Sequence, residues 1–340
     1  MKIKKEEILG IMKKVYDSII SNASNIGNDT SELIIFNNET ITGFNEEIAV
    51  NYPFKTGIEC AVRLTELYKL LQKVKDDSIA LIIENNELIL EAKNIDAGFP
   101  LIKDYTVPDI GNEVDNWETL PTGFIDGIQF CSFSVSTDIS DGILVALEIK
   151  DNHIRTTDNY RLTDYYMGSK IKFPFLLHQK FIKSITAHNP IKVSQDESWI
   201  HFCDEKDGIL SVRKLAESYP EIDEFFNIEK IEDITFSPKL EDILGRVRIL
   251  ALDENNNENA IVTINNDEII CECQGEYGWI VEAIKNETKH KIKKELKFIA
   301  GIQHLLQILD KTKTAIIGEN RLLFEHENFK HVIVTTPSKE

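Results

Sequence analysis

Cysteine is scarce in this sequence, and long apolar runs are missing. The five cysteines are odd in number, scattered and without metal-site spacing: Cys60, Cys131, Cys203, Cys271 and Cys273. They predict reduced thiols rather than a disulfide framework. No apolar run approaches the roughly 18 residues that a spanning helix needs, and the charged N-terminal segment lacks a signal-peptide cleavage site. We expect a cytoplasmic protein with no membrane partner.

Signatures of catalysis are also missing. The sequence contains no GxxxxGK[ST], GxGxxG or HExxH, and its histidines show no paired metal spacing. The acidic stretches at 138–141 and 253–258 lack the glycine and terminal glutamate of an EF-hand, so they favour solvated turns. We therefore expect a protein that is not an enzyme, with no catalytic residues, no metal and no cofactor.

Positive charge is in deficit, with 38 lysines and arginines against 57 aspartates and glutamates and a net charge of −19. This balance argues against a generally basic, phosphate-binding surface. Binding depends on where the charges lie, so they have to be located along the chain before nucleic acid is excluded as a partner.

The sequence does contain a threefold repeat. Apolar-periodic helical segments at 8–15, 124–131 and 240–247 start 116 residues apart each time. Each is followed by two β-rich runs around an Asn/Asp pair, which tolerates the positive φ of a tight turn. These turn pairs are Asn37-Asn38, Asp151-Asn152 and Asn265-Asn266.

A second helical segment and a second hairpin follow in each repeat. The helical segments span 62–74, 178–188 and 296–309. A period this long indicates tandem domains rather than a solenoid of short repeats. We predict an α+β fold of three similar domains (1–115, 116–230 and 231–340), each with two helices packed on antiparallel sheets.

Basic residues gather in and around the six helical segments. Together the segments and their flanks (1–20, 58–76, 120–133, 178–190, 238–250 and 291–313) carry 20 Lys/Arg against 11 Asp/Glu, or +9. The remaining chain therefore carries −28. This segregation predicts one surface that meets phosphate and another that repels it, although lysine is also common on exposed helices for propensity and solubility alone.

Five short runs resemble the bacterial DNA polymerase III β subunit, the DNA sliding clamp. The run 156–162 (TTDNYRL) is similar to the family's alanine, threonine, aspartate, glycine, histidine, arginine, leucine motif, with Thr156, Asn159 and Tyr160 as departures. Asparagine is a mild replacement for glycine because it tolerates left-handed backbone. Further similar runs occur in family order: 140–144 (SDGIL), 218–222 (SYPEI), 275–282 (GEYGWIVE) and 332–337 (VIVTTP).

The resemblance implies the DNA clamp fold: three-domain protomers that form a head-to-tail homodimer, with six domains in a closed ring. Helices would line the hole and sheets would form the outer wall. The implied function is that of a processivity factor in DNA replication. It encircles double-stranded DNA without reading sequence and tethers a DNA polymerase, with a clamp loader as a further partner. The resemblance does not distinguish a host-encoded from a phage-encoded member.

Three sets of residues follow from the helical positions and the resemblance. Candidate hole-lining residues are Lys13, Lys14, Arg63, Lys69, Lys73, Lys180, Lys183, Arg246, Arg248 and Lys297. The resemblance implies a partner-peptide pocket made by Thr157, Asn159, Tyr160, Arg161, Leu162, Pro220, Gly301, His304, Val334, Thr336, Pro337 and Ser338. It also implies a dimer interface at Ile249 and Leu250, against the region 73–93 of a second copy.

Alternatives stay open at this point. Ile249 and Leu250 could fill the core of the third domain instead of an interface. The chain could be an acidic interaction protein, such as a DNA mimic, that binds basic partners. It could also be a hydrolase with a site at the domain junctions, although no catalytic dyad is visible in the sequence.

Overall fold

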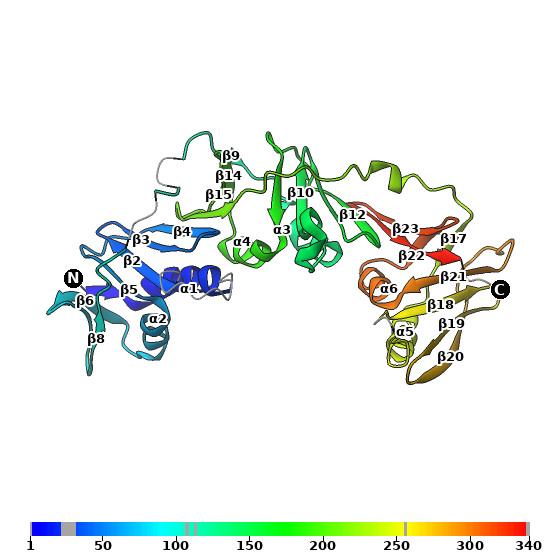
Figure 1. The fold of residues 1–340 in the computed structure, drawn as a ribbon, viewed down its shortest axis with the longest axis horizontal. Helices are drawn as coiled ribbons and strands as arrows, with labels where there is room; N and C mark the ends of the chain where they lie inside the picture. The colour runs from blue at the N-terminus through cyan, green and yellow to red at the C-terminus, as the bar shows by residue number, and fades with distance from the viewer. Residues whose placement is uncertain (1, 22–31, 106–108, 112–113, 255–256, 338–340) are drawn as a thin grey trace. The chain divides into compact units, whose positions relative to one another are not determined.

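A computed structural model describes residues 2–21, 32–105, 109–111, 114–254 and 257–337. Its helices and antiparallel strands form an α+β fold, as predicted (Figure 1). The α-helices are α1 (Lys5–Ser21), α2 (Leu64–Lys73), α3 (Phe124–Cys131), α4 (Ile182–His188), α5 (Leu240–Arg248) and α6 (Ile302–Leu309).

The strands occur in three runs of eight within the described residues. The first run is β1 (Lys2–Lys4), β2 (Leu33–Asn37), β3 (Thr40–Phe44), β4 (Ile48–Pro53), β5 (Glu59–Arg63), β6 (Ser78–Glu84), β7 (Glu87–Ala92) and β8 (Ile95–Pro100). The second is β9 (Glu118–Thr119), β10 (Ala146–Lys150), β11 (His153–Thr157), β12 (Arg161–Tyr166), β13 (Phe175–His178), β14 (Lys192–Gln195), β15 (Trp199–Cys203) and β16 (Ile209–Arg213). The third is β17 (Glu232–Thr235), β18 (Asn259–Ile264), β19 (Glu268–Gly275), β20 (Gly278–Lys285), β21 (Leu296–Gly301), β22 (Thr314–Ile317), β23 (Arg321–His326) and β24 (Phe329–Val334), followed by β25 (Thr336–Pro337).

The same pairing of strands joins each run to the next. The fourth strand of the first run, β4, pairs with the last strand of the second, β16, from Ile48↔Val212 to Asn51↔Ile209. The fourth strand of the second run, β12, pairs in the same way with the last strand of the third, β24. The two strands that would continue this rule are both among the sheet edges. They are β8, in the order β1-β6-β7-β8, and β20, in the order β20-β19-β18-β21-β25.

These pairings divide the chain into two compact units. One contains Met1–Ile125 and Ser169–Ala216, and the other contains Asp126–Gly168 and Glu217–Glu340. Because β4 and β16 share a sheet, the first run and the end of the second lie in one unit. The boundaries near 115 and 230 stay a prediction about tandem domains.

In the first unit, α1 and α2 pack together, and α1 also contacts β3, β4 and α4 (Figure 1). The buried face of α1 carries Ile8, Met12, Val15 and Ile19, which are fully inaccessible to solvent. Their spacing of three to four residues places them on one helical stripe, so the apolar periodicity of the sequence corresponds to the side that covers the sheet.

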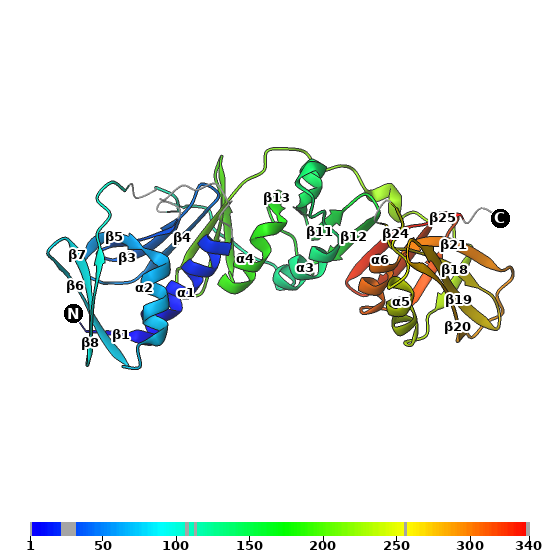
Figure 2. The ribbon, with the colours of Figure 1, turned by 60° about the horizontal axis from the view of Figure 1, so that its bottom comes forward.

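In the second unit, α5 and α6 lie side by side against the strands of the third run (Figure 2). Helix α5 buries Leu240, Ile243, Leu244 and Val247. Arg246 and Arg248 lie in the last turn of this helix, where positive charge is favourable to the helix dipole.

The predicted hairpins are confirmed, with one difference in turn chemistry. Asn38 and Asp151 have φ values of 46° and 54°, so the first two turns use left-handed backbone as expected. The third turn does not. Its Asn265 side chain accepts from the backbone N–H groups of Asp267 and Glu268, 2.9 Å away in each case, which closes the turn by side-chain capping.

Three helical segments were predicted too long at their N-terminal ends. Residues 62–63 belong to β5, and residues 296–301 form β21. The apolar run LKFIAGIQHLL cannot reveal this from periodicity, because a buried strand and a buried helix both appear as continuous apolar stretches. Residues 178–181 end β13 and form the 3₁₀ turn η4 (Gln179–Phe181) before α4 begins.

The five cysteines are buried and form no disulfides. Burial raises the pKa of the Cys271 thiol to about 12, which makes it a poor nucleophile. Among the described residues, no helix combines the length and apolar character required to cross a membrane.

Candidate interaction surfaces

A buried polar cluster lies at the junction of β4 and β16. The Lys14 ammonium group donates to Asp204 Oδ2 (2.9 Å), to the Tyr52 hydroxyl (3.0 Å) and to the His188 carbonyl (3.3 Å). Gly208 leaves room for the tyrosine, since a Cβ there would lie 2.1 Å from Tyr52 Cε1. Lys14 was predicted to line a DNA-binding surface, but here its ammonium group is engaged in holding α1 to this junction.

Protonation in this cluster follows from its hydrogen bonds. Burial by itself would raise the pKa of Asp204, but donors from Lys14, Tyr52 and the Lys206 backbone lower it below its usual range. Burial lowers the pKa of His188 to about 4, so its ring is neutral. His188 Nε2 faces the carbonyls of Phe202 and Gly208 and donates to them. Its Nδ1 and the Asp204 carboxylate, 2.8 Å and 2.7 Å from the Tyr52 hydroxyl oxygen, are therefore both acceptors for the single hydroxyl proton.

The helices are less basic than the sequence segments indicated. Counted over the observed helices with η4, Lys and Arg number 9 and Asp and Glu number 7, for a net charge of +2 rather than +9. The difference lies on strands and loops that the segments included, above all at 291–297, where β21 and the loop before it carry four lysines. Net charge therefore gives only weak support to a phosphate-facing helical surface.

Several of the predicted basic residues have acidic partners. Lys180 pairs with Glu47, Arg246 with Glu282 and Arg248 with Glu258. Lys297 lies 3.6 Å from Glu272 on a strand, not on a helix as predicted. Arg63 also belongs to a strand, at the end of β5.

Four of the predicted residues are exposed lysines on helices without such partners. Lys13 lies on α1, Lys69 and Lys73 on α2, and Lys183 on α4. Within the described part of the chain, no ion pair involves them. All four belong to the first compact unit.

Several of the predicted peptide-pocket residues lie in or next to the turn between β11 and β12. Asn159 has a φ of 72°, in the left-handed region that favours glycine or asparagine. The Asp158 carboxylate accepts from the backbone N–H groups of Tyr160 (3.1 Å) and Arg161 (3.0 Å) and from Arg161 Nε (2.8 Å). The Thr157 backbone N–H donates to the Tyr219 hydroxyl at 2.9 Å. The turn is thus held rigidly from both sides.

Arg161 connects this turn to the helices. Its side chain is almost fully buried, donates to Gln307 on α6 and lies 5.5 Å over the Phe133 ring. A buried guanidinium is stable only where its donors are satisfied, as they are here by Asp158 and Gln307. Leu162, the next residue, is buried in β12.

Other predicted pocket residues lie around the same turn. The Tyr160 ring is 6.1 Å from the ring of His304, whose pKa is lowered by burial and by Arg161. The Val334 backbone N–H donates to the Tyr160 carbonyl at 2.8 Å. Gly301 precedes α6, and Thr336 and Pro337 in β25 pair with β21. Pro220 is exposed next to Tyr219, and Ser338 lies outside the described residues.

The predicted interface residues follow the basic end of α5. Ile249 is 73% exposed, so it does not fill the core. Leu250 is half-buried beside the turn between β19 and β20, with its methyl carbons 3.8 Å from a Cβ built on Gly278. On the neighbouring edge strand β20, Trp279 is 71% exposed and Val281 is also exposed.

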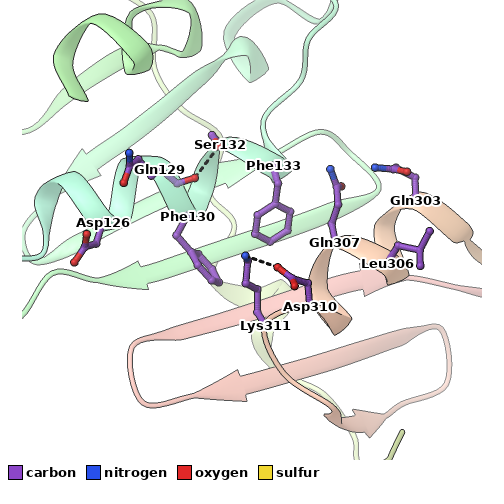
Figure 3. Close-up of a pocket in the computed structure, with 10 residues that line it drawn as sticks. All are labelled: Asp126, Gln129, Phe130, Ser132, Phe133, Gln303, Leu306, Gln307, Asp310 and Lys311. Atoms are coloured by element: carbon purple, nitrogen blue, oxygen red, sulfur yellow. Dashed lines mark hydrogen bonds and ion pairs between the residues drawn. The ribbon is translucent and has the colours of Figure 1, made fainter. Parts of the chain in front are cut away.

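A cleft between α3 and α6 could not be found from the sequence. Its volume is about 710 Å³, and Figure 3 shows side chains of both helices around it. It is lined by Asp126, Gln129, Phe130, Ser132, Phe133, Gln303, Leu306, Gln307, Asp310 and Lys311. The two helices are separated by about 170 residues of sequence, and no motif links them.

The repeated sheet junctions and the helices packed on the sheets define a DNA clamp fold. The chain aligns over 99% of its length with the crystal structure of the DNA polymerase III subunit beta from Pseudomonas aeruginosa, covering all of that chain, with a TM-score of 0.83 and 14% identity. It matches the DNA polymerase sliding clamp from Bacillus subtilis (TM-score 0.82, 15% identity) and the beta subunit from DNA polymerase of Streptococcus pyogenes (0.83, 17%), each over 99% of both chains. No protein-family model and no curated protein sequence matches the chain. The predicted fold is therefore confirmed at a sequence identity that shows the fold alone.

Proposed function

We propose that this protein is a non-enzymatic DNA sliding clamp, a processivity factor that encircles double-stranded DNA and tethers a DNA polymerase. It would act as a head-to-tail homodimer in the cytoplasm, be placed on DNA by a clamp loader, and need neither metal nor cofactor. The observation that carries this proposal is the rule that joins the strands.

Each internal junction pairs the fourth strand of one run with the last strand of the next. Applied once more, the rule requires a partner for β20, the fourth strand of the third run. It also requires a partner for β8, the last strand of the first run. Both are sheet edges in one protomer. Pairing β20 with β8 of a second copy, and the reverse, would close a ring of two chains by a two-fold operation.

The surface near β20 suits such a contact. Ile249 and Trp279 are both more than two-thirds exposed, although large apolar side chains at these positions would gain from burial. In each internal junction the first helix of one run lies near the second helix of the next. The same relation would bring α5 to α2 of the second copy, the helix that ends at Lys73, where the predicted contact region 73–93 begins.

For DNA, the proposal relies on individual lysines rather than on net charge. Lys13, Lys69, Lys73 and Lys183 are exposed and unpaired among the described residues, so their ammonium groups can replace counterions at phosphates. The contacts would carry no sequence information, which suits a protein that must slide.

For partner proteins, we propose that the surface around Tyr160, Arg161, Leu162, Gly301 and His304 takes a short apolar peptide. The rigid turn and the buried arginine would orient the peptide by a few polar groups beside an apolar wall. Thr336, where the resemblance leads one to expect methionine, would make this wall more polar and the binding weaker.

Retention on DNA tests the function. We expect the protein to run as a ring-sized dimer and, after loading, to remain on nicked circular DNA while sliding off the same DNA made linear. Equal loss from both forms would contradict encirclement. Under the DNA-mimic alternative there would be no topological retention, and basic proteins would be bound instead.

Closure can be tested with the double variant Ile249→Ala/Leu250→Ala. Because Ile249 is exposed in the protomer, we expect folded monomers with nearly unchanged thermal unfolding that do not stay on circular DNA. Sedimentation and circular dichroism distinguish this from a core defect. A destabilised dimer would refute the proposed interface.

The DNA contacts can be tested by salt dependence. Replacing Lys13, Lys69, Lys73 and Lys183 by glutamine should flatten the slope of log K against log salt by about one unit per lost phosphate contact. Lys55, an exposed lysine paired with Glu39 outside the helices, provides a control. An unchanged slope in the fourfold variant would contradict the assignment.

A further inference from the structure

The cleft between α3 and α6 has a lining unlike that of a DNA-facing surface. Of its ten lining residues, Asp126 and Asp310 are acidic and only Lys311 is basic. Phe130 and Phe133 provide two rings, and three glutamines provide amide groups (Figure 3). Apart from the Gln307 oxygen, which accepts from Arg161, the cleft offers carboxylates, amide oxygens and ring faces, all of which attract cations.

The equivalent junction in the first unit shows that a carboxylate, a carbonyl and an aromatic ring can together hold a cation. The repeats begin 116 residues apart, so Lys14 on α1 corresponds to Phe130 on α3. The Lys14 ammonium group lies 2.9 Å from Asp204, 3.3 Å from a carbonyl oxygen and 5.2 Å from the centre of the Tyr52 ring. The first junction thus contains its own cation, held by a carboxylate, a carbonyl and an aromatic ring. In the second junction the lysine is replaced by phenylalanine.

Groups able to hold a cation nevertheless surround the second junction. The Gln303 side-chain oxygen is buried and has no hydrogen-bond partner among the described residues. Asp126 is exposed on α3 and forms no ion pair within the described part of the chain. One ring that lines the cleft already contacts a cation, because the Arg161 guanidinium lies 5.5 Å from the centre of the Phe133 ring.

Lys311 is a weakly held cation in the same space. In Figure 3 its amine points between Phe130 and Phe133 and is joined to Asp310. The two groups are 2.6 Å apart, but both side chains are substantially exposed and adjacent in sequence. Such an exposed pair contributes little and exchanges readily with solvent, so a stronger cation can displace it.

We propose that the α3–α6 cleft binds a basic side chain, arginine or lysine, on a short segment of a partner protein. The segment supplies in trans the cation that the first junction carries as Lys14. Its apolar neighbours pack on Phe130, Phe133 and Leu306. A volume of about 710 Å³ is within the range of peptide and ligand sites and far exceeds one side chain. The site lies within one compact unit, so it does not require the ring to close.

A labelled pentapeptide with two arginines flanking a leucine, capped by glycines, is the probe, titrated by calorimetry. We expect binding by the arginine peptide and by its lysine counterpart. The citrulline counterpart, which keeps the shape without the charge, should bind about tenfold more weakly or not at all. Asp126→Asn should weaken the arginine peptide by a similar factor.

The sign of the Lys311→Gln effect decides the class of ligand. Removing the competing internal cation should tighten the arginine peptide several-fold, whereas Lys291→Gln, an exposed lysine outside the lining, should change nothing. Weaker binding by Lys311→Gln would overturn the proposal in favour of an acidic or phosphate ligand. Equal binding of the citrulline peptide, or no binding of the arginine peptide to any variant, would also overturn it. Retention on circular DNA is measured separately and does not depend on these outcomes.

Discussion

At the β4–β16 junction a lysine, a tyrosine, a histidine and an aspartate share one buried cluster, whereas at the β12–β24 junction aromatic rings occupy the equivalent place. Phe130 lies 4.4 Å from Phe329 and 5.5 Å from Tyr165, measured between ring centres. The backbone pairing is the same in both cases. The comparison shows that backbone pairing between strands defines where two runs meet. The side chains at each junction then decide whether the adjacent helices are held together or leave a cleft between them.

The largest effect should come from removing the acid of the first junction. Asp204 accepts from Lys14, Tyr52 and two backbone N–H groups. Asp204→Ala leaves these donors without their acceptor, and we expect a loss of about 3 kcal/mol in the free energy of unfolding. This is the low end of the usual range, because Lys14 can still reach water. Urea unfolding measures it, with the exposed neighbour Glu205→Ala as a control. A loss below about 1 kcal/mol would show that the cluster contributes no more than a surface pair.

The second junction should be broken by removing an aromatic ring. Phe130 is half-buried and contacts three other rings, so Phe130→Ala should cost about 2 kcal/mol, less than for a fully buried phenylalanine. Phe130→Lys would place in the second junction the residue that the first one has. If Asp126 and Gln303 accept its ammonium group, Phe130→Lys should be less destabilising than Phe130→Ala, in the same urea assay. The reverse order would contradict the equivalence of the two junctions.

Each junction contains a buried histidine with a lowered pKa, His188 in the first and His331 in the second, so stability should depend on pH. Burial lowers the pKa of His188 from its ordinary value of 6.5 to about 4. Between these pH values the His188 ring is protonated in the unfolded chain but neutral in the folded chain. The free energy of unfolding therefore falls as the pH drops from 6.5 towards 4. His178, with its pKa also lowered to about 4 by burial, contributes in the same window. His188→Gln should reduce the slope of melting temperature against pH in that window, and an unchanged slope would assign it to other groups.

The smallest effect should come from the acid of the second junction. Asp310 forms an ion pair with Lys311 and with no other described residue, and both side chains are exposed. Asp310→Asn should therefore change the free energy of unfolding by less than about 0.5 kcal/mol. A loss comparable to that of Asp204→Ala would mean that this cleft is a structural cluster and not an open site.

Local patterns in the sequence predicted local structure well. Short-range spacing in the sequence is enough to predict the turn at Asp151 and the buried stripe of α1, which consists of Ile8, Met12, Val15 and Ile19. The strand at 296–301 was predicted as helix because a continuous apolar run has no period that separates the two states. The excess of charge on helices was overestimated for the same reason, since it included lysines that lie on β21 and in the loop before it.

Residues distant in sequence account for what sequence patterns missed. Lys14 and Asp204 are 190 residues apart, and only the pairing of β4 with β16 brings them together. An aspartate in an acidic turn and a lysine on an amphipathic helix are ordinary features, so nothing in either segment marks a buried ion pair. The α3–α6 cleft was missed likewise, because its lining combines residues of two runs.

Main-chain hydrogen bonds form the β4–β16 and β12–β24 junctions, and this affects which substitutions the chain can accept over evolutionary time. Every residue except proline carries the N–H and C=O groups that a ladder requires. Substitutions in β4, β12, β16 and β24 can therefore accumulate as long as the inward-facing side chains stay buried. A junction with a hydrogen-bonded cluster and a junction with a cleft can both form on the same backbone pairing. Retaining a TM-score of 0.83 at 14–17% identity is what such a junction permits. The same backbone pairing can therefore be kept while the side chains at each junction change what the junction binds.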